Sequence, residues 1–221
     1  MVTTISIPRT TASKILLKKA LLACGLISSL YYIAINILVP LFYPGYSHIT
    51  YTISELSAIG SPTRQLWLWL GPFYILFFAA FGWGILKVAR DNHPLRIAGI
   101  LILVYSIINF YWPPMHVRGT ETTMSDTLHL VWGGIASIGM IMMMGFSAAA
   151  FGKKFRIYSI TTIVLLLVFG FLMSLEAPNI PTNEPTPLIG FWERLMLGVF
   201  LLYISALSVK LINRESLPSG K

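Results

Sequence analysis

Six long apolar stretches constrain what this chain can fold into more than any other feature of its sequence. A helix needs roughly 20 mostly apolar residues to cross the hydrocarbon core of a bilayer, and each of the six stretches meets that requirement. The stretches cover residues 20–42, 66–86, 95–112, 127–151, 156–175 and 191–212. We therefore predict an all-α fold, a polytopic membrane bundle of six transmembrane helices over residues 20–212, with short segments 1–19 and 213–221 at its ends.

The composition excludes a soluble protein. Of the 221 residues, 56% are hydrophobic and 11% are charged, whereas a typical soluble domain carries about 25% charged residues. A chain of this size leaves much of its surface exposed when it folds, so this much apolar surface cannot be hidden inside one globule. The single cysteine, Cys24, excludes an internal disulfide and a metal cluster held by cysteines.

Lysine and arginine residues are concentrated at one end of the predicted bundle. Of the 16 basic residues, only Arg64, Arg118 and Arg194 fall at the other end. Because cytoplasmic loops carry the excess of basic residues, this asymmetry predicts a multi-pass protein of the cell membrane with both termini in the cytoplasm. The net charge of +8 then comes from basic residues that surround the cytoplasmic ends of the helices. We accordingly predict membrane lipid as the partner of the chain and no nucleic acid.

Small residues four apart let transmembrane helices approach closely. The stretch 127–151 contains two such pairs, Gly133 with Ser137 and Gly145 with Ala149. These pairs predict that the fourth helix lies at the centre of the bundle.

Acidic residues and histidines gather at the predicted extracytoplasmic end. Asp126 and His129 lie three residues apart where the fourth stretch begins, a spacing that places both side chains on one helix face. Together with His116 they are candidate ligands of a zinc ion, and as a catalytic pair Asp126 would orient the His129 ring as a base. Two structural interpretations compete, namely Asp126 as a helix N-cap and His129 as a polar residue at the membrane interface.

The first loop at the same end contains a helix signal. Thr52 and Glu55 have the spacing of a capping box, and Gly60 is a suitable stop, so residues 53–60 predict a short helix at the membrane surface. Glu55 is a candidate catalytic carboxylate, with capping as the alternative interpretation. Ser54, beside it, is a candidate substrate-binding residue.

The last stretch begins with adjacent opposite charges, Glu193 and Arg194. Glu193 complements the positive end of the helix dipole, whereas Arg194 opposes it. Neighbouring residues do not face each other on a helix, so Arg194 is expected to pair with Glu55, Asp126 or Glu176 at the mouth of the bundle. Both residues are candidate substrate-binding groups, and a structural salt bridge is the competing interpretation.

Two of these segments resemble motifs of a known family. The sequence ISELSAIGSP at residues 53–62 and the sequence GFWERL at residues 190–195 are similar to the first-loop motif and the start of the last helix in the domain of unknown function 998 family, which comprises six-helix membrane proteins of bacteria and archaea. The resemblance implies the same six-helix fold and singles out Glu55, Glu193 and Arg194, but it names no reaction.

Three classes of function remain open at this point. The outer cluster of histidines, acids and Arg194 is typical of a membrane-embedded hydrolase or transferase acting on a lipid or lipid-linked substrate, with zinc as the candidate cofactor. A non-catalytic sensor or assembly partner would use the same cluster for docking. A small-solute transporter is the third hypothesis, although the sequence has no charged residue near the middle of any span.

Overall fold

The structure, a computed structural model, describes residues 9–216 of the chain. Six long helices dominate it: α1 (Arg9–Leu38), α2 (Arg64–Ala89), α3 (His93–Phe110), α4 (Met124–Ala150), α5 (Lys153–Glu176) and α7 (Ile189–Ser216). Three short helices lie in the connections: η1 (Val39–Phe42), η2 (Ser54–Ser57) and α6 (Asn179–Thr182). The ends of the two predicted terminal segments, residues 1–8 and 217–221, lie outside the described residues.

All six long helices are long and apolar enough to cross a membrane. The prediction of an all-α bundle of six transmembrane helices is therefore confirmed. The first helix begins earlier than residue 20, at Arg9. The basic residues before the apolar stretch, such as Lys14 and Lys18, are good helix formers, so the helix continues through them.

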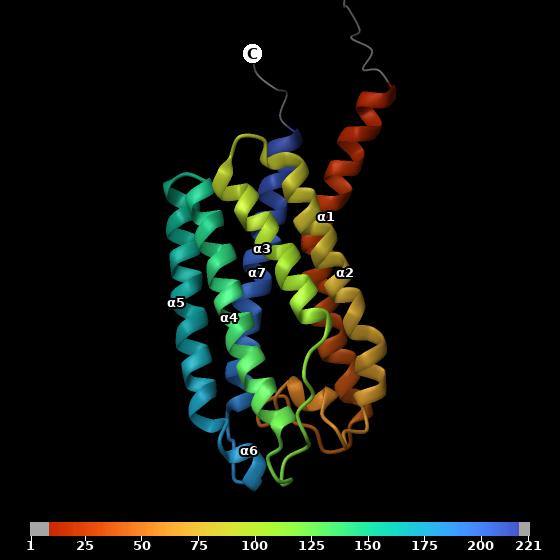
Figure 1. The fold of residues 1–221 in the computed structure, drawn as a ribbon, viewed down its shortest axis with the longest axis vertical. Helices are drawn as coiled ribbons and strands as arrows, with labels where there is room; N and C mark the ends of the chain where they lie inside the picture. Colours follow the sequence, from red (N-terminus) through yellow and green to blue (C-terminus); the bar gives the residue numbers. More distant parts are fainter. Residues whose placement is uncertain (1–8, 217–221) are drawn as a thin grey trace, which may run out of the picture.

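The long helices run up and down in chain order and form a ring (Figure 1). Each long helix packs against the next along the chain, and α7 closes the ring by packing against both α5 and α1. The turns at residues 90–92 and 151–152 lie at the same end as the described chain ends, which we call the terminal end. The longer connections, residues 39–63, 111–123 and 177–188, all lie at the opposite end, which we call the loop end (Figure 1).

The most buried helix is α7, and the prediction of a central fourth helix is wrong. In an apolar 18-residue segment of each helix, 44% of the α7 residues are buried, compared with 28% of the α4 residues. A Cβ atom added at Gly133 or Gly145 of α4 would meet nothing within 4 Å. The close approach occurs instead between α2 and α3, where a Cβ on Gly82 would lie 2.8 Å from Ile102 and 3.1 Å from the carbonyl oxygen of Gly99.

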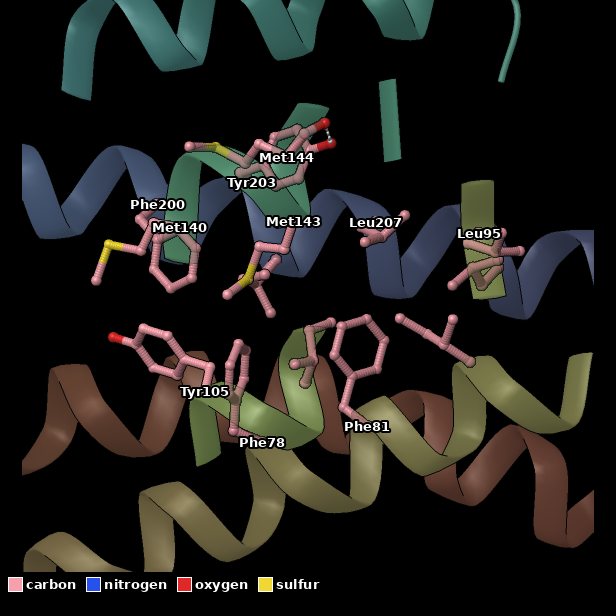
Figure 2. Packing of buried hydrophobic residues seen from close by; sticks show 14 of the residues in the cluster. Phe78, Phe81, Leu95, Tyr105, Met140, Met143, Met144, Phe200, Tyr203 and Leu207 are labelled. Atoms are coloured by element: carbon pink, nitrogen blue, oxygen red, sulfur yellow. Dashed lines mark hydrogen bonds between the residues drawn. The ribbon is translucent and has the colours of Figure 1, made fainter. Parts of the chain in front are cut away.

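The core fills the interior of this ring, and Figure 2 shows buried side chains of the cluster packed between the helices. The ring of Phe78 of α2 packs edge-to-face against the ring of Phe200 of α7, with centroids 6.1 Å apart. Met143 and Met144 of α4 are fully buried in the same cluster. Tyr203 places its hydroxyl 3.0 Å from Ser159 Oγ, so the polar tip of this buried ring is satisfied by α5.

Candidate functional site

Two loops at the loop end are joined by backbone hydrogen bonds. Ile59 N–H donates to the Met115 carbonyl oxygen at 2.7 Å, and Val117 N–H donates to the Ile59 carbonyl oxygen at 3.1 Å. Gly60, the predicted helix stop, follows with a φ of 92°, a conformation that favours glycine. This pairing brings the segment that contains Arg118 alongside η2, the short helix that the sequence predicted.

Glu55 lies on η2 and is 1% exposed. Arg118 holds it with a bidentate ion pair, in which Nε lies 2.7 Å from Oε1 and Nη2 lies 2.9 Å from Oε2. The Thr52 N–H donates to Oε2 at 2.7 Å, and the Glu55 N–H donates to Thr52 Oγ1 at 3.2 Å, which is the reciprocal pairing of the predicted capping box. The carboxylate is therefore occupied by four donors when the Thr52 hydroxyl at 3.1 Å is included.

Arg118 connects three loops, and sequence reasoning did not single it out. Its Nη2 also donates to the Thr50 carbonyl oxygen at 3.0 Å, and its Nη1 donates to Thr186 Oγ1 at 3.2 Å. The guanidinium lies 3.9 Å from the centroid of the Tyr51 ring. Burial lowers the pKa of Arg118, but the hydrogen bond and charge of Glu55 outweigh it, so the net direction is upward and the guanidinium stays charged. The sequence feature that could have identified Arg118 is that few basic residues lie among the acidic residues of this end.

Arg194 binds backbone carbonyls rather than an acid. Its Nη1 donates to the carbonyl oxygens of His48 at 2.8 Å, Gly190 at 2.9 Å and Tyr51 at 3.0 Å, and its Nη2 donates to Tyr46 Oη at 2.6 Å. Burial lowers the pKa of His48, and the charge of Arg194 lowers it further. Arg194 therefore ties the first loop to the start of α7.

The predicted pairing of Arg194 with Glu55, Asp126 or Glu176 is wrong, because within residues 9–216 the arginine forms no ion pair. The physical reason is competition: Arg118 already occupies Glu55, and the loop carbonyls match the donors of Arg194. Its neighbour Glu193 is 7% exposed and accepts a hydrogen bond from the Ile53 N–H, which attaches α7 to η2.

Asp126 takes part in the cap of α4, but at the third helical position and not at the predicted N-cap position, which Thr123 occupies. Its Oδ2 accepts from the Thr123 N–H at 2.9 Å and from Thr123 Oγ1 at 2.7 Å, which completes a capping box. Its Oδ1 accepts from the His116 N–H at 2.7 Å, and His116 Nδ1 lies 3.0 Å from Oδ2. The structure thus brings His116 and Asp126 together.

His129 lies apart from that pair. It is 8% exposed, its Nδ1 lies 2.7 Å from the carbonyl oxygen of Pro113, and the indole N–H of Trp112 donates to the same nitrogen at 2.9 Å. Among residues 9–216, no three His, Cys, Asp or Glu side chains form a group that could hold a metal ion. The predicted zinc ligands His116, Asp126 and His129 are therefore not assembled into one site in this part of the chain.

A cavity of about 890 Å³ opens within the loop-end half of the bundle. It is walled by residues from all six long helices, among them Tyr32, Tyr74, Tyr105, Met140, Gly170 and Phe200. Three of the predicted site residues line it, namely Ser54, His129 and Glu193, whereas Glu55, His116, Asp126 and Arg194 are not among its lining residues. The predicted residues therefore fall into two groups: three line the cavity, and the other four hold the loops and helix ends in place.

Asn109 of α3 also lines the cavity and carries an unpaired acceptor. Its Nδ2 donates to the Tyr105 carbonyl oxygen at 2.8 Å, but its buried Oδ1 has no hydrogen-bond partner among the described residues. A buried polar atom without a partner is costly. An amide inside an apolar stretch was the sequence signal for this position.

Comparison with known proteins gives a family but no activity. A family model described as a protein of unknown function, DUF998, matches residues 26–210. No curated protein and no solved structure matches the chain.

Proposed function

The chain belongs to the DUF998 family of proteins of unknown function, and we propose from its geometry that it binds a membrane lipid or lipid-linked molecule in the loop-end cavity. The observation that carries the proposal is the character of the cavity wall. Rings and aliphatic chains such as Tyr105, Met140 and Phe200 line the part that lies between the helices, and Ser54 and Arg64 line the part near the loops. That gradient matches a molecule with an apolar chain and a polar head.

The unpaired Oδ1 of Asn109 supports the same proposal. It lies on the cavity wall and can accept a hydrogen bond from a hydroxyl or amide of the bound molecule. Asn109 is only 8% exposed, so such a donor must come from within the cavity. We assign the loop end to the extracytoplasmic side of the cell membrane, because few basic residues lie there.

The finer proposal is that the bound molecule is cleaved or transferred, with His129 as the base. With its ring held by Trp112 and the Pro113 carbonyl, neutral His129 can take the proton of a water or alcohol as its oxygen attacks an ester of the substrate, and can then return that proton to the leaving oxygen. Glu193 lies on the same cavity wall. Among the predicted catalytic residues, only His129 lines the cavity, so Glu55 and Asp126 are given structural roles.

Filling the cavity is expected to remove lipid binding. Gly133 lines the cavity, and a Cβ there would meet nothing within 4 Å, so the ring of Gly133→Phe has room to enter the cavity. Crosslinking of phosphatidylethanolamine with a diazirine on its acyl chain should fall about tenfold, the equivalent of about 1.4 kcal/mol. Tandem mass spectrometry of peptides from α4 and α7 measures the yield.

The control for that experiment is Gly145→Phe on the same helix. Gly145 is equally free of neighbours within 4 Å but does not line the cavity. Its crosslinking should match the wild type. Equal crosslinking in both variants and the wild type would contradict lipid binding in this cavity.

Replacing His129 separates catalysis from binding. His129→Gln keeps a polar side chain in the wall but removes the base, so crosslinking should persist while release of headgroup from a radiolabelled phospholipid falls about 10²–10⁴-fold. Water-soluble label after incubation in vesicles measures the release. Unchanged release in the variant would exclude His129 as the base, and absence of release in the wild type would leave lipid binding as the function.

A further inference from the structure

A second hollow lies at the terminal end, far from the loop-end cavity. It is a groove of about 910 Å³ between the start of α5 and the last turns of α7. Its floor is apolar and aromatic, with Phe155 and Tyr158 among the lining residues, and its basic residues are Lys154, Lys210 and Arg214. None of the lining residues is acidic.

The three cations of this groove form no ion pair within residues 9–216. The nearby Glu215 is paired instead with Lys18 of α1 at 3.9 Å. Lys210 Nζ lies over the rings of Phe151 and Phe155, 4.9 Å and 5.3 Å from their centroids. Aromatic faces hold an ammonium in place while leaving its charge available to an anion.

The start of α5 adds to the positive potential. Its first turn carries Lys153, Lys154 and Arg156 without an acidic residue, and Gly152 at the N-cap position provides no side-chain cap. Cations at a helix N-terminus are unfavourable because the helix dipole is positive there. An anion placed beside this turn would relieve that repulsion.

We propose that the groove between α5 and α7 is a binding site for an anionic phospholipid of the surrounding bilayer. Its phosphate would lie among Lys154, Lys210 and Arg214, and an acyl chain would follow the apolar floor past Tyr158 toward the membrane interior. Both helices are membrane-spanning, so the groove lies where headgroups meet hydrocarbon. The proposal rests on charge complementarity together with this apolar floor, and it does not depend on the function of the loop-end cavity.

The test compares phosphatidylglycerol with phosphatidylcholine of the same acyl chains, titrated onto the full-length protein in detergent and counted by native mass spectrometry. The wild type should bind phosphatidylglycerol at least about tenfold more tightly than phosphatidylcholine, because only phosphatidylglycerol carries a net negative charge that the three cations attract. The triple variant Lys154→Gln, Lys210→Gln, Arg214→Gln should lose that preference. Inorganic phosphate at a hundredfold excess should not displace the bound lipid.

A matched variant removes the same charge from the same end without touching the groove. Lys87→Gln, Arg90→Gln, Arg96→Gln changes three exposed basic residues near the turn between α2 and α3 that do not line it, so the preference should persist within about twofold. Equal loss in both triple variants would overturn the proposal in favour of a diffuse surface charge. Displacement by phosphate alone would overturn it in favour of a soluble anion, as would the lack of any preference in the wild type.

A second variant covers the case in which the triple variant fails to fold. Val209 is 44% exposed and lines the groove, so Val209→Trp fills the apolar floor while all three cations stay in place. We expect it to weaken phosphatidylglycerol binding about tenfold. Undiminished binding by a folded Val209→Trp protein would overturn the assignment of the acyl chain to this groove.

Discussion

Replacing Arg118 with methionine is expected to lower the free energy of unfolding by about 3–5 kcal/mol, because the change leaves the carboxylate of Glu55 buried without its partner. Glu55 is 1% exposed, and both of its oxygens accept from the guanidinium. The same variant also loses the hydrogen bonds from Arg118 to the Thr50 carbonyl oxygen of the first loop and to Thr186 Oγ1 in the connection before α7. Thermal and denaturant unfolding of the detergent-solubilised protein measures the loss.

A double-mutant cycle separates the ion pair from the other contacts of Arg118. Glu55→Gln removes the buried charge, so the double variant with Arg118→Met should be more stable than the sum of the single effects predicts. Arg96→Met serves as the control, because Arg96 is an exposed arginine of α3 and should change stability by less than about 0.5 kcal/mol. Strictly additive effects of Glu55→Gln and Arg118→Met would contradict the pairing.

The contacts of Glu55 show which features of the site could be predicted from the sequence and which could not. The capping box of Thr52 with Glu55 could be predicted because its partners lie three residues apart in the chain, whereas the N-cap predicted at Asp126 is formed by Thr123. The ion pair joins residues 63 positions apart through two loops, and no local pattern encodes that distance. The six helices were readable for a similar reason, since the bilayer imposes a length on each stretch independently of its neighbours.

The three predicted zinc ligands are not brought together within residues 9–216, for a different physical reason. The spacing of Asp126 and His129 placed both on one helix face, but the Asp126 carboxylate is used in the helix cap, and Trp112 and the Pro113 carbonyl hold the His129 ring. Small-residue pairs were similarly ambiguous: Gly133 of α4 lines a cavity, whereas Gly82 of α2 makes the close helix contact. A glycine in a helix shows only that the position has no side chain. Whether backbone, a side chain or a cavity lies beside it depends on the neighbouring helix.

Substituting Gly190 with alanine is the second change with a large expected effect. Alanine normally stabilises a helix relative to glycine by about 0.5–1 kcal/mol. At Gly190 a Cβ would overlap the carbonyl oxygen of Tyr51 and would lie 2.8 Å from that of His48 and 2.9 Å from Arg194 Nη1. Two of these atoms belong to backbone that Arg194 holds in place, so the loop must move away from α7. We expect a loss of about 3 kcal/mol, the range of overpacking in a dense core.

The matched control is Gly198→Ala, two turns along the same helix. A Cβ at Gly198 would meet nothing within 4 Å, so this variant should unfold at the wild-type temperature or above it. Limited proteolysis between residues 43 and 53 tests the cause, because a first loop displaced from α7 by Gly190→Ala should be cut faster while the loop in Gly198→Ala should not. Equal stability and equal cleavage of the two variants would show that the first loop does not need the glycine. The loop, Arg194 and the start of α7 would then not form the close-packed unit that the contacts of Arg194 indicate.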